Sequence, residues 1–159
     1  MDSFLPSIKK GLAKAEAPER FSCRIYGVLR RRGEVLLTRS RFIDRQFVNF
    51  PGGGVDLGEA PIEALRREYR EETGLAIKPV RVLYASESAH LSTQVPMQIV
   101  SIYWLIERLS GTLKKDGNSD DVLSLFWAPL KRIPTGEMFP SDLEFARRLP
   151  NLLSSGKSR

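Results

Sequence analysis

Three glutamates, Glu68, Glu71 and Glu72, follow one another at the spacing of a single helical turn. On an isolated helix, like charges at this spacing repel one another by a few tenths of a kcal/mol per pair. A bound divalent cation would compensate for that repulsion. The clustered ligands are all oxygens, without cysteine or histidine, so they suit Mg²⁺ or Mn²⁺ and do not suit Zn²⁺. The alternative is a solvated acidic helix face, in which Glu63 forms ion pairs with neighbouring arginines.

A glycine run precedes the glutamates. Pro51-Gly52-Gly53-Gly54 cannot lie inside a helix, and consecutive glycines let the backbone take positive φ and approach a ligand closely. A loop of this kind can point carbonyl groups at a metal ion. Pro61 suits a first helical turn and Gly74 suits a helix end, so a helix is predicted over about residues 60–73.

The two sides of this predicted helix differ in character. A wheel of about 100° per residue groups Ile62, Leu65 and Tyr69 on one face and the three glutamates on the flank beside it. Arg66 and Arg70 point the other way, toward solvent.

Residues 53–75 fit the pattern G-x(5)-E-x(7)-R-E-U-x-E-E-x-G-U, where U is a large apolar residue. The matching positions are Gly53, Glu59, Arg67, Glu68, Tyr69, Glu71, Glu72, Gly74 and Leu75. With a background frequency of roughly 7% for each fixed residue type, the chance per window is on the order of one in a hundred million. The segment resembles the Nudix box, the signature of the Nudix hydrolase family. Tyr69 is the loosest fit, and we expect its ring to pack inward and its hydroxyl to find a partner.

The resemblance extends over about residues 21–133, through a strand at 35–37, an entry loop at 50–53 and a late strand at 126–130. It implies the α/β class, as a Nudix-type α/β/α sandwich with a mixed β-sheet. We expect one Nudix hydrolase domain over residues 1–159, with an N-terminal helical extension at 1–18 and a flexible tail at 154–159.

The resemblance also implies an activity: metal-dependent hydrolysis of a diphosphate linkage by water attack on phosphorus, with Mg or Mn as cofactor. The metal ligands it implies are Glu68, Glu71, Glu72 and the carbonyl of Gly52. Gly53 and Glu59 would support them, and Arg67 would fix the loop by hydrogen bonds to a carboxylate or to carbonyls. Glu68 is a candidate general base, and a late loop offers three others, Asp116, Asp120 and Asp121, of which we choose Asp121.

Substrate contacts are expected from Arg39, Arg41 and Arg45, between a strand and the glycine loop. Phe42, Phe47 or Tyr84 could stack on a base or simply pack. The substrate is left open among a nucleotide sugar, ADP-ribose and a nucleoside triphosphate. Two further alternatives are a catalytically weak nucleotide-metabolite sensor and an RNA pyrophosphohydrolase. A nucleic-acid partner is not favoured, since no groove of interleaved basic and aromatic residues is visible.

The whole chain has 159 residues, 42% of them apolar, which is enough for one domain with its own core. It lacks a signal-like or membrane-spanning apolar run, so a cytoplasmic protein is expected, with a homodimer possible. The net charge of +6 suits a phosphorylated partner or simple solubility, and Arg30-Arg31-Arg32-Gly33 is typical of a charged hairpin turn.

The remaining elements follow from periodicity. Helices are expected at 7–16 and from N-cap candidates Ser141 and Asp142 onward. Strands are expected at 21–30, 35–39, 46–50, 80–86, 98–106 and 123–127, and the apolar run 99–106 indicates a strand covered on both faces. Cys23 is expected to be a small buried hydrophobe, and His90 a strand-end or loop residue.

Overall fold

The computed structural model describes residues 18–155, apart from 93–94 and 119. The strands are β1 (Arg20–Arg31), β2 (Glu34–Phe42), β3 (Arg45–Asn49), β4 (Gly52–Gly54), β5 (Leu75–Ala85), β6 (His90–Leu91), β7 (Met97–Gly111) and β8 (Val122–Pro129). The helices are α2 (Pro61–Thr73) and α3 (Pro140–Ser154), with short 3₁₀ turns η1 (Leu130–Arg132) and η2 (Thr135–Glu137). No helix in these residues is long and apolar enough to cross a membrane.

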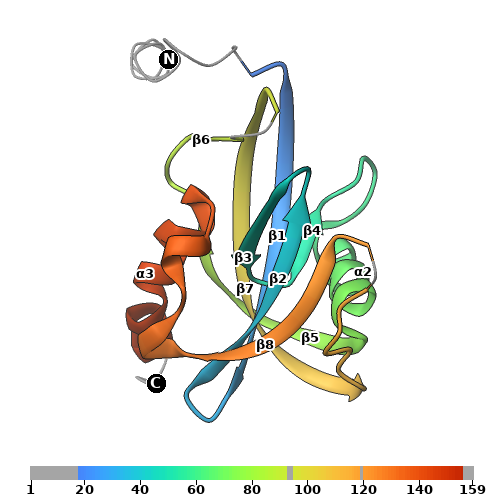
Figure 1. Cartoon of the computed structure of the whole chain (residues 1–159), viewed down its shortest axis with the longest axis vertical. Coiled ribbons are helices and arrows are strands. Elements are labelled where there is room, and N and C mark those ends of the chain that lie inside the picture. Colours follow the sequence, from blue (N-terminus) through green and yellow to red (C-terminus); the bar gives the residue numbers. More distant parts are fainter. Residues whose placement is uncertain (1–17, 93–94, 119, 156–159) are drawn as a thin grey trace.

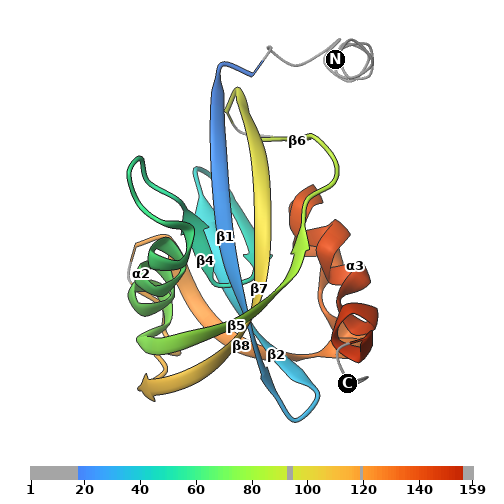
Figure 2. The same cartoon turned by 180° about the vertical axis from the view of Figure 1, so that it is seen from behind.

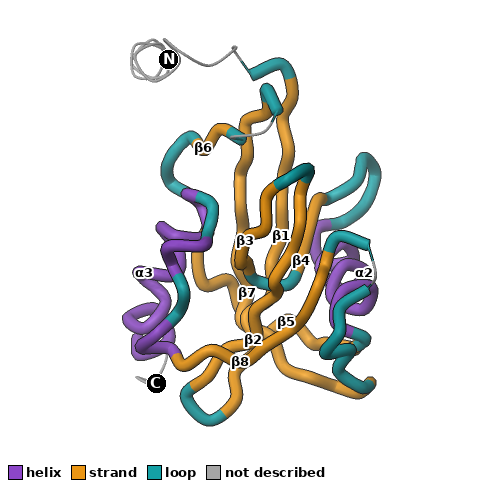
Figure 3. Tube along the Cα trace, in the orientation of Figure 1, coloured by secondary structure: helices purple, strands orange, loops and turns teal. Residues whose placement is uncertain are grey.

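The strands form one mixed sheet in the order β3-β2-β1-β7-β5. β1 and β7 run parallel and side by side, while the other pairs are antiparallel; β4 adds to β1, β6 to β7 and β8 to β2. The two helices lie on opposite sides of the strands, α2 beside β4 and α3 beyond β7 (Figures 1 and 3). The predicted α/β/α sandwich with a mixed sheet is confirmed.

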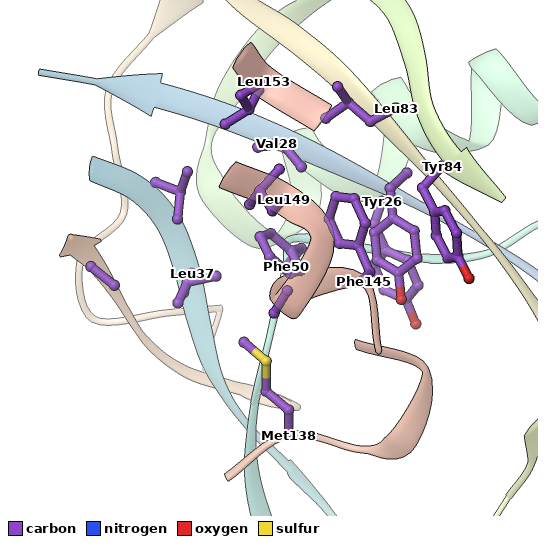
Figure 4. Close-up of a cluster of buried hydrophobic side chains, with 14 of the residues drawn as sticks. Tyr26, Val28, Leu37, Phe50, Leu83, Tyr84, Met138, Phe145, Leu149 and Leu153 are labelled. Carbon is purple, nitrogen blue, oxygen red and sulfur yellow. The ribbon is translucent and has the colours of Figure 1, made fainter. Parts of the chain in front are cut away.

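The sheet separates two cores because alternate side chains of a strand point to opposite faces. The core under α3 is aromatic: the ring of Tyr103 stacks on that of Phe145 at 3.9 Å between centroids. Phe50 meets Phe145 edge-on at 5.1 Å, and Figure 4 shows these two rings within the core. The core under α2 is mostly aliphatic, with Ile25 and Leu65 fully buried.

The boundaries of α2 follow from its sequence. Pro61 occupies the first helical position, where its missing N–H is no loss, and the Glu63 carboxylate accepts a hydrogen bond from the Ala60 backbone N–H at 3.3 Å. Gly74 ends the helix in the left-handed conformation, with φ of 77°. The predicted helix is confirmed to within one residue at its start.

Tyr69 fills the centre of the α2 core and is fully buried. Its ring packs against Gly27 of β1, where a Cβ atom would lie only 2.7 Å from ring atom Cε2. The inward ring is as expected, but the expected hydroxyl partner is wrong: within the described part of the chain, Tyr69 Oη is buried without a hydrogen bond.

Helix α3 begins at Pro140 after Phe139, so the predicted N-caps Ser141 and Asp142 are wrong. A proline at the first position needs no capping acceptor for its own nitrogen, and Asp142 accepts a hydrogen bond from Tyr103 Oη at 2.9 Å. The helix runs to Ser154, so the predicted C-terminal tail cannot begin at residue 154. The helix predicted at 7–16 and the rest of the predicted tail, at 156–159, lie outside the described residues.

Several strand predictions also need correction. β5 starts at residue 75 and β7 continues to residue 111, because their antiparallel ladder holds even where the apolar pattern ends. The run 99–106 is only partly covered, since Ile102 and Trp104 are half-buried. Cys23 is likewise half-buried, beside Phe21, whose side chain is 65% exposed. Here the sheet extends beyond α2: Figure 2 shows the upper parts of β1 and β7 standing clear of the helix.

Candidate active site

The glycine run that was predicted to be a loop forms the short strand β4. This strand pairs with β1, and Gly53 lies opposite Ile25. This pairing leaves no room for a side chain at Gly52, where φ is 147° and a Cβ atom would lie 2.1 Å from the Ile25 carbonyl oxygen. The Gly52 N–H points to α2 and donates a 2.8 Å hydrogen bond to Glu72 Oε2. The glycine run therefore fixes the backbone of β4 against a buried carboxylate.

The next glycine is required by Glu68. A Cβ atom on Gly53 would lie 2.4 Å from the carboxyl carbon of Glu68, whereas one on Gly54 would meet nothing within 4 Å. The Glu68 carboxylate thus packs directly on the backbone of β4, because Gly53 has no side chain there. Two carboxylates of α2, those of Glu68 and Glu72, are held against neighbouring glycines of one strand.

Glu72 is buried, with 5% of its surface exposed. Burial is the main cause that raises its pKa, to about 8, and the charges of Asp121 and Glu68 add to the rise. The Gly52 hydrogen bond and the charge of Arg24 oppose it. A carboxylate in this setting stays ionised more readily when a cation lies beside it.

Arg67 ties the flank of α2 to the chain before it. Its guanidinium makes two 2.8 Å hydrogen bonds to the Glu59 carboxylate, one of 2.9 Å to Glu68 Oε1 and one of 3.2 Å to the Gly54 carbonyl. The hydrogen bonds from Arg67 lower the pKa of Glu59 to about 2. These are the bonds to a carboxylate and a carbonyl that were expected of Arg67.

The third glutamate lies apart from the other two. Glu71 is more exposed, at 56% of its side chain, and its carboxylate is 3.5 Å from Arg67 Nη1. Accordingly, within residues 18–155 with their gaps, no three acidic, histidine or cysteine side chains converge as a ready-made metal-holding group. The donors nonetheless fit a hard cation in type: the buried carboxylate of Glu72 and the half-buried one of Glu68 both have a raised pKa and lie against the backbone of β4.

The paired acidic face proposed as the alternative does not form as described. The Glu63 carboxylate is bonded to the Ala60 N–H, and no ion pair joins it to Arg66 or Arg67 in the described residues.

Of the three aspartates of the late loop, Asp121 acts electrostatically on Glu72, where it raises the pKa. Asp121 Oδ1 accepts a 2.9 Å hydrogen bond from Asn118 Nδ2, and its backbone carbonyl accepts one of 2.7 Å from the Arg41 N–H. The structure thus brings Asp121 toward the carboxylates, and its role as a base stays a prediction.

The three arginines predicted to contact substrate do not converge on one point. Arg39 Nη1 donates to Glu137 Oε2 at 2.5 Å, and the Arg45 guanidinium lies 5.2 Å from the ring centre of Phe139. The Arg41 side chain is exposed. All three come from the β2–β3 hairpin, and their contact with a substrate stays a prediction.

Sequence reasoning missed a second polar cluster, under the start of α3. Arg24 donates a 2.8 Å hydrogen bond to Tyr26 Oη, and Tyr103 Oη contacts both Ser141 and Asp142. Burial raises the pKa of Asp142 to about 7, while the Tyr103 hydrogen bond and the charge of Arg24 lower it. Arg24 also acts on Glu68 and so lies between the two clusters. The sequence signal that could have indicated this cluster is Arg24, a charged residue within the otherwise mostly apolar strand β1.

Comparison with known proteins is consistent with this geometry. The model of the NUDIX domain family matches residues 18–149. The 8-oxo-dGTP diphosphatase of Haemophilus influenzae is 28% identical over 131 residues, 79% of this chain and 88% of that protein. The RNA pyrophosphohydrolase of Actinobacillus succinogenes is 45% identical, but over 60 residues, 38% of this chain and 29% of that protein.

Among solved structures, a MutT NUDIX hydrolase from Burkholderia pseudomallei superposes with a TM-score of 0.71 at 22% identity. The match covers 82% of this chain and 99% of that one. At this level of identity the likeness shows a shared fold.

Proposed function

Because the chain belongs to the NUDIX domain family, hydrolases that act on phosphorus anhydrides, we propose that it cleaves a nucleoside triphosphate at a diphosphate linkage with Mg²⁺ or Mn²⁺. The observation that carries the proposal is Glu72: a buried carboxylate with one backbone donor, other acids nearby and a raised pKa. Such a group favours a cation as its partner.

The metal would be held by the carboxylates of Glu68, Glu71 and Glu72 and by the Gly52 carbonyl. When bound, it supplies Lewis-acid stabilisation of charge on the phosphate oxygens and lowers the pKa of water. Glu68 and Glu71 both contact Arg67, at 2.9 and 3.5 Å, and Glu71 is the more exposed of the two.

The remaining residues position these donors. Arg67 holds the Glu59 loop and the Gly54 carbonyl, so it keeps β4 and α2 in register. Gly53 lets Glu68 approach the strand. The Asp121 carboxylate accepts a proton from the water that attacks phosphorus; the anhydride P–O bond breaks, and the departing phosphate oxygen keeps its electron pair. The carboxylate of Glu68 is the alternative base.

A nucleoside triphosphate is proposed first because the 8-oxo-dGTP diphosphatase is matched over 88% of its length. Arg39, Arg41 and Arg45 would meet the terminal phosphates or the sugar. Nucleotide sugars and ADP-ribose bear the same diphosphate linkage and serve as test substrates.

The test is product analysis by anion-exchange chromatography, with nucleoside triphosphates, nucleotide sugars and ADP-ribose each incubated with Mg²⁺, Mn²⁺ or EDTA. Triphosphate turnover that EDTA abolishes and added Mg²⁺ restores is expected. Turnover in EDTA would contradict the proposed metal dependence. Turnover of nucleotide sugars or ADP-ribose alone would contradict a nucleoside triphosphate as the substrate. Tight nucleotide binding without any turnover would favour the sensor.

An RNA pyrophosphohydrolase is the second candidate, favoured by the 45% identity over 60 residues. Triphosphorylated RNA and a free triphosphate of the same 5′ nucleotide separate the two candidates. Faster release of diphosphate from the RNA would replace the first proposal by the second.

A further inference from the structure

A groove lies on the flank of α2 that faces away from the glutamates, between the helix and the ends of β5 and β7. Its volume is about 440 Å³, within the range of ligand sites. The lining residues are Arg66, Arg67, Arg70, Ala76, Ile77, Lys78 and Leu109.

The walls of this groove, which we call the α2–β5 groove, are cationic. Arg66, Arg70 and Lys78 are exposed, and none of them forms an ion pair with a described residue. The acid nearest in the ladder is Glu107, which is exposed and stands opposite Lys78 on β7. Three cations that form no ion pair within the described residues leave a positive potential over the groove.

Apolar groups line the rest of the groove. Ile77 is buried, at 3% exposure, whereas the Leu109 side chain is 65% exposed at the groove edge. An exposed leucine beside unpaired cations offers a ligand both charge and an apolar contact. A small inorganic anion would use only the first.

We propose that the α2–β5 groove binds single-stranded nucleic acid, with backbone phosphates on Arg66, Arg70 and Lys78 and a base against Leu109. The two arginines stand four residues apart on one helix, ~6 Å along its axis, so they can meet successive phosphates. Their planar guanidinium groups bind phosphate through paired hydrogen bonds and also stack on bases.

A phosphodiester strand fits this groove better than an acidic peptide. A strand presents one charge and one flat ring in every unit, which matches a row of cations beside an apolar edge. A peptide needs acidic and apolar side chains in a special order to do the same. The net charge of +6 for the whole chain also attracts a polyanion.

The inference goes beyond the proposed function and does not depend on hydrolysis. Arg67 lines the groove and also bonds Glu59 and Glu68, so the groove and the candidate active site share one side chain. For this reason Arg67 is left unchanged in the test.

The experiment uses fluorescence anisotropy with a short single-stranded RNA whose 5′ end carries a dye in place of phosphates. The groove variant is Arg66→Glu with Arg70→Glu, and Lys78→Glu tests the groove from another element. The matched control is Arg30→Glu with Arg32→Glu, two exposed arginines at the end of β1 and in the turn that follows it, an equal change of charge. Binding should weaken about tenfold or more in the groove variant at low salt, with a slope of log affinity against log salt reduced by about 2.

The control variant should bind RNA nearly as tightly as the natural chain does. All variants should hydrolyse the nucleoside triphosphate at the same rate as the natural chain. Equal weakening in both double variants, or no RNA binding by the natural chain at low salt, would overturn the proposal. Stronger competition by a polyglutamate peptide or by a free nucleoside triphosphate than by unlabelled RNA would also overturn it, in favour of that ligand.

Discussion

Two buried carboxylates, Glu72 under α2 and Asp142 under α3, differ in what surrounds them. Both are at most 5% exposed, and burial raises the pKa of both. The charge of Arg24 acts on both carboxylates. Glu72 accepts its hydrogen bond from a backbone N–H and has other acids around it, whereas Asp142 accepts one from a tyrosine hydroxyl. At equal burial, neighbouring acids add to the rise in the pKa of Glu72, whereas no neighbouring acid adds to the rise at Asp142.

The difference distinguishes the region of Glu72, which can bind a cation, from the region of Asp142, which supports the fold. Near Glu72 the neighbours Glu68 and Asp121 add negative charge, so the protein alone does not neutralise this region. Near Asp142 the stacked rings of the α3 core close around a hydrogen bond to Tyr103. Four predictions test this contrast, beginning with the largest effect.

Glu72→Gln should reduce turnover at least about 100-fold, because it removes a charge that the metal needs. The amide keeps the size of the side chain and an acceptor for the Gly52 N–H, so the fold should persist. Steady-state kinetics and binding of Mn²⁺ followed by magnetic resonance measure the effect. Glu63→Gln, on an exposed position of the same helix, is the control and should keep full turnover; retained Mn²⁺ affinity in Glu72→Gln would contradict the contrast.

Gly53→Ala should reduce turnover about 10- to 100-fold, since a Cβ atom would fall 2.4 Å from the carboxyl carbon of Glu68 and displace it. Gly54→Ala, one residue on, meets nothing within 4 Å and should have little effect. The ratio of kcat/KM between the two variants measures how far Glu68 depends on the bare strand. Equal activities would show that the position of Glu68 is not critical.

Asp142→Asn should remove a pH dependence of stability. The folded pKa of Asp142, about 7, lies above the ordinary value of 3.8, so the native state keeps a proton that the unfolded chain releases. Between these two values stability falls as pH rises, by at most about 1.4 kcal/mol per pH unit from this group. Urea unfolding from pH 4 to pH 7 should show the natural chain losing stability relative to Asp142→Asn as pH rises. Parallel profiles would mean that Asp142 ionises normally in the fold.

Tyr69→Phe gives the smallest effect, a gain in unfolding free energy of about 1 kcal/mol, because it removes a buried hydroxyl without a hydrogen-bond partner. The ring keeps its contact with Gly27, so turnover should not change. Thermal unfolding measures the gain. A loss of stability would reveal a partner for the hydroxyl, such as an enclosed water molecule.

The sequence predicted best where a pattern depends on local geometry. The bounds of α2 follow from Pro61 and Gly74, whose backbone preferences act within one turn. The resemblance implied hydrogen bonds from Arg67 to a carboxylate or to carbonyls, and the structure identifies the partners as Glu59, Glu68 and the Gly54 carbonyl.

What the sequence did not reveal depends on contacts between distant segments. Asp142 has the residue type and position of a helix cap, yet Tyr103, which lies 39 residues earlier, makes it a buried acceptor. The α2–β5 groove combines one helix flank with two strand ends, so no single stretch shows it. The extended ladder of β5 and β7 likewise depends on pairing, which overrides a weak apolar pattern.

The close contact between Gly27 and the Tyr69 ring has a consequence for how this chain can evolve. A methyl group at residue 27 would collide with the ring, and an aliphatic side chain at residue 69 would leave a void beside the glycine. Neither a side chain at residue 27 nor an aliphatic residue at 69 is tolerated alone, so descendants of this sequence that lose the ring should exchange the two positions together. In relatives with a leucine or isoleucine at the position of Tyr69, the strand residue facing it should carry a side chain.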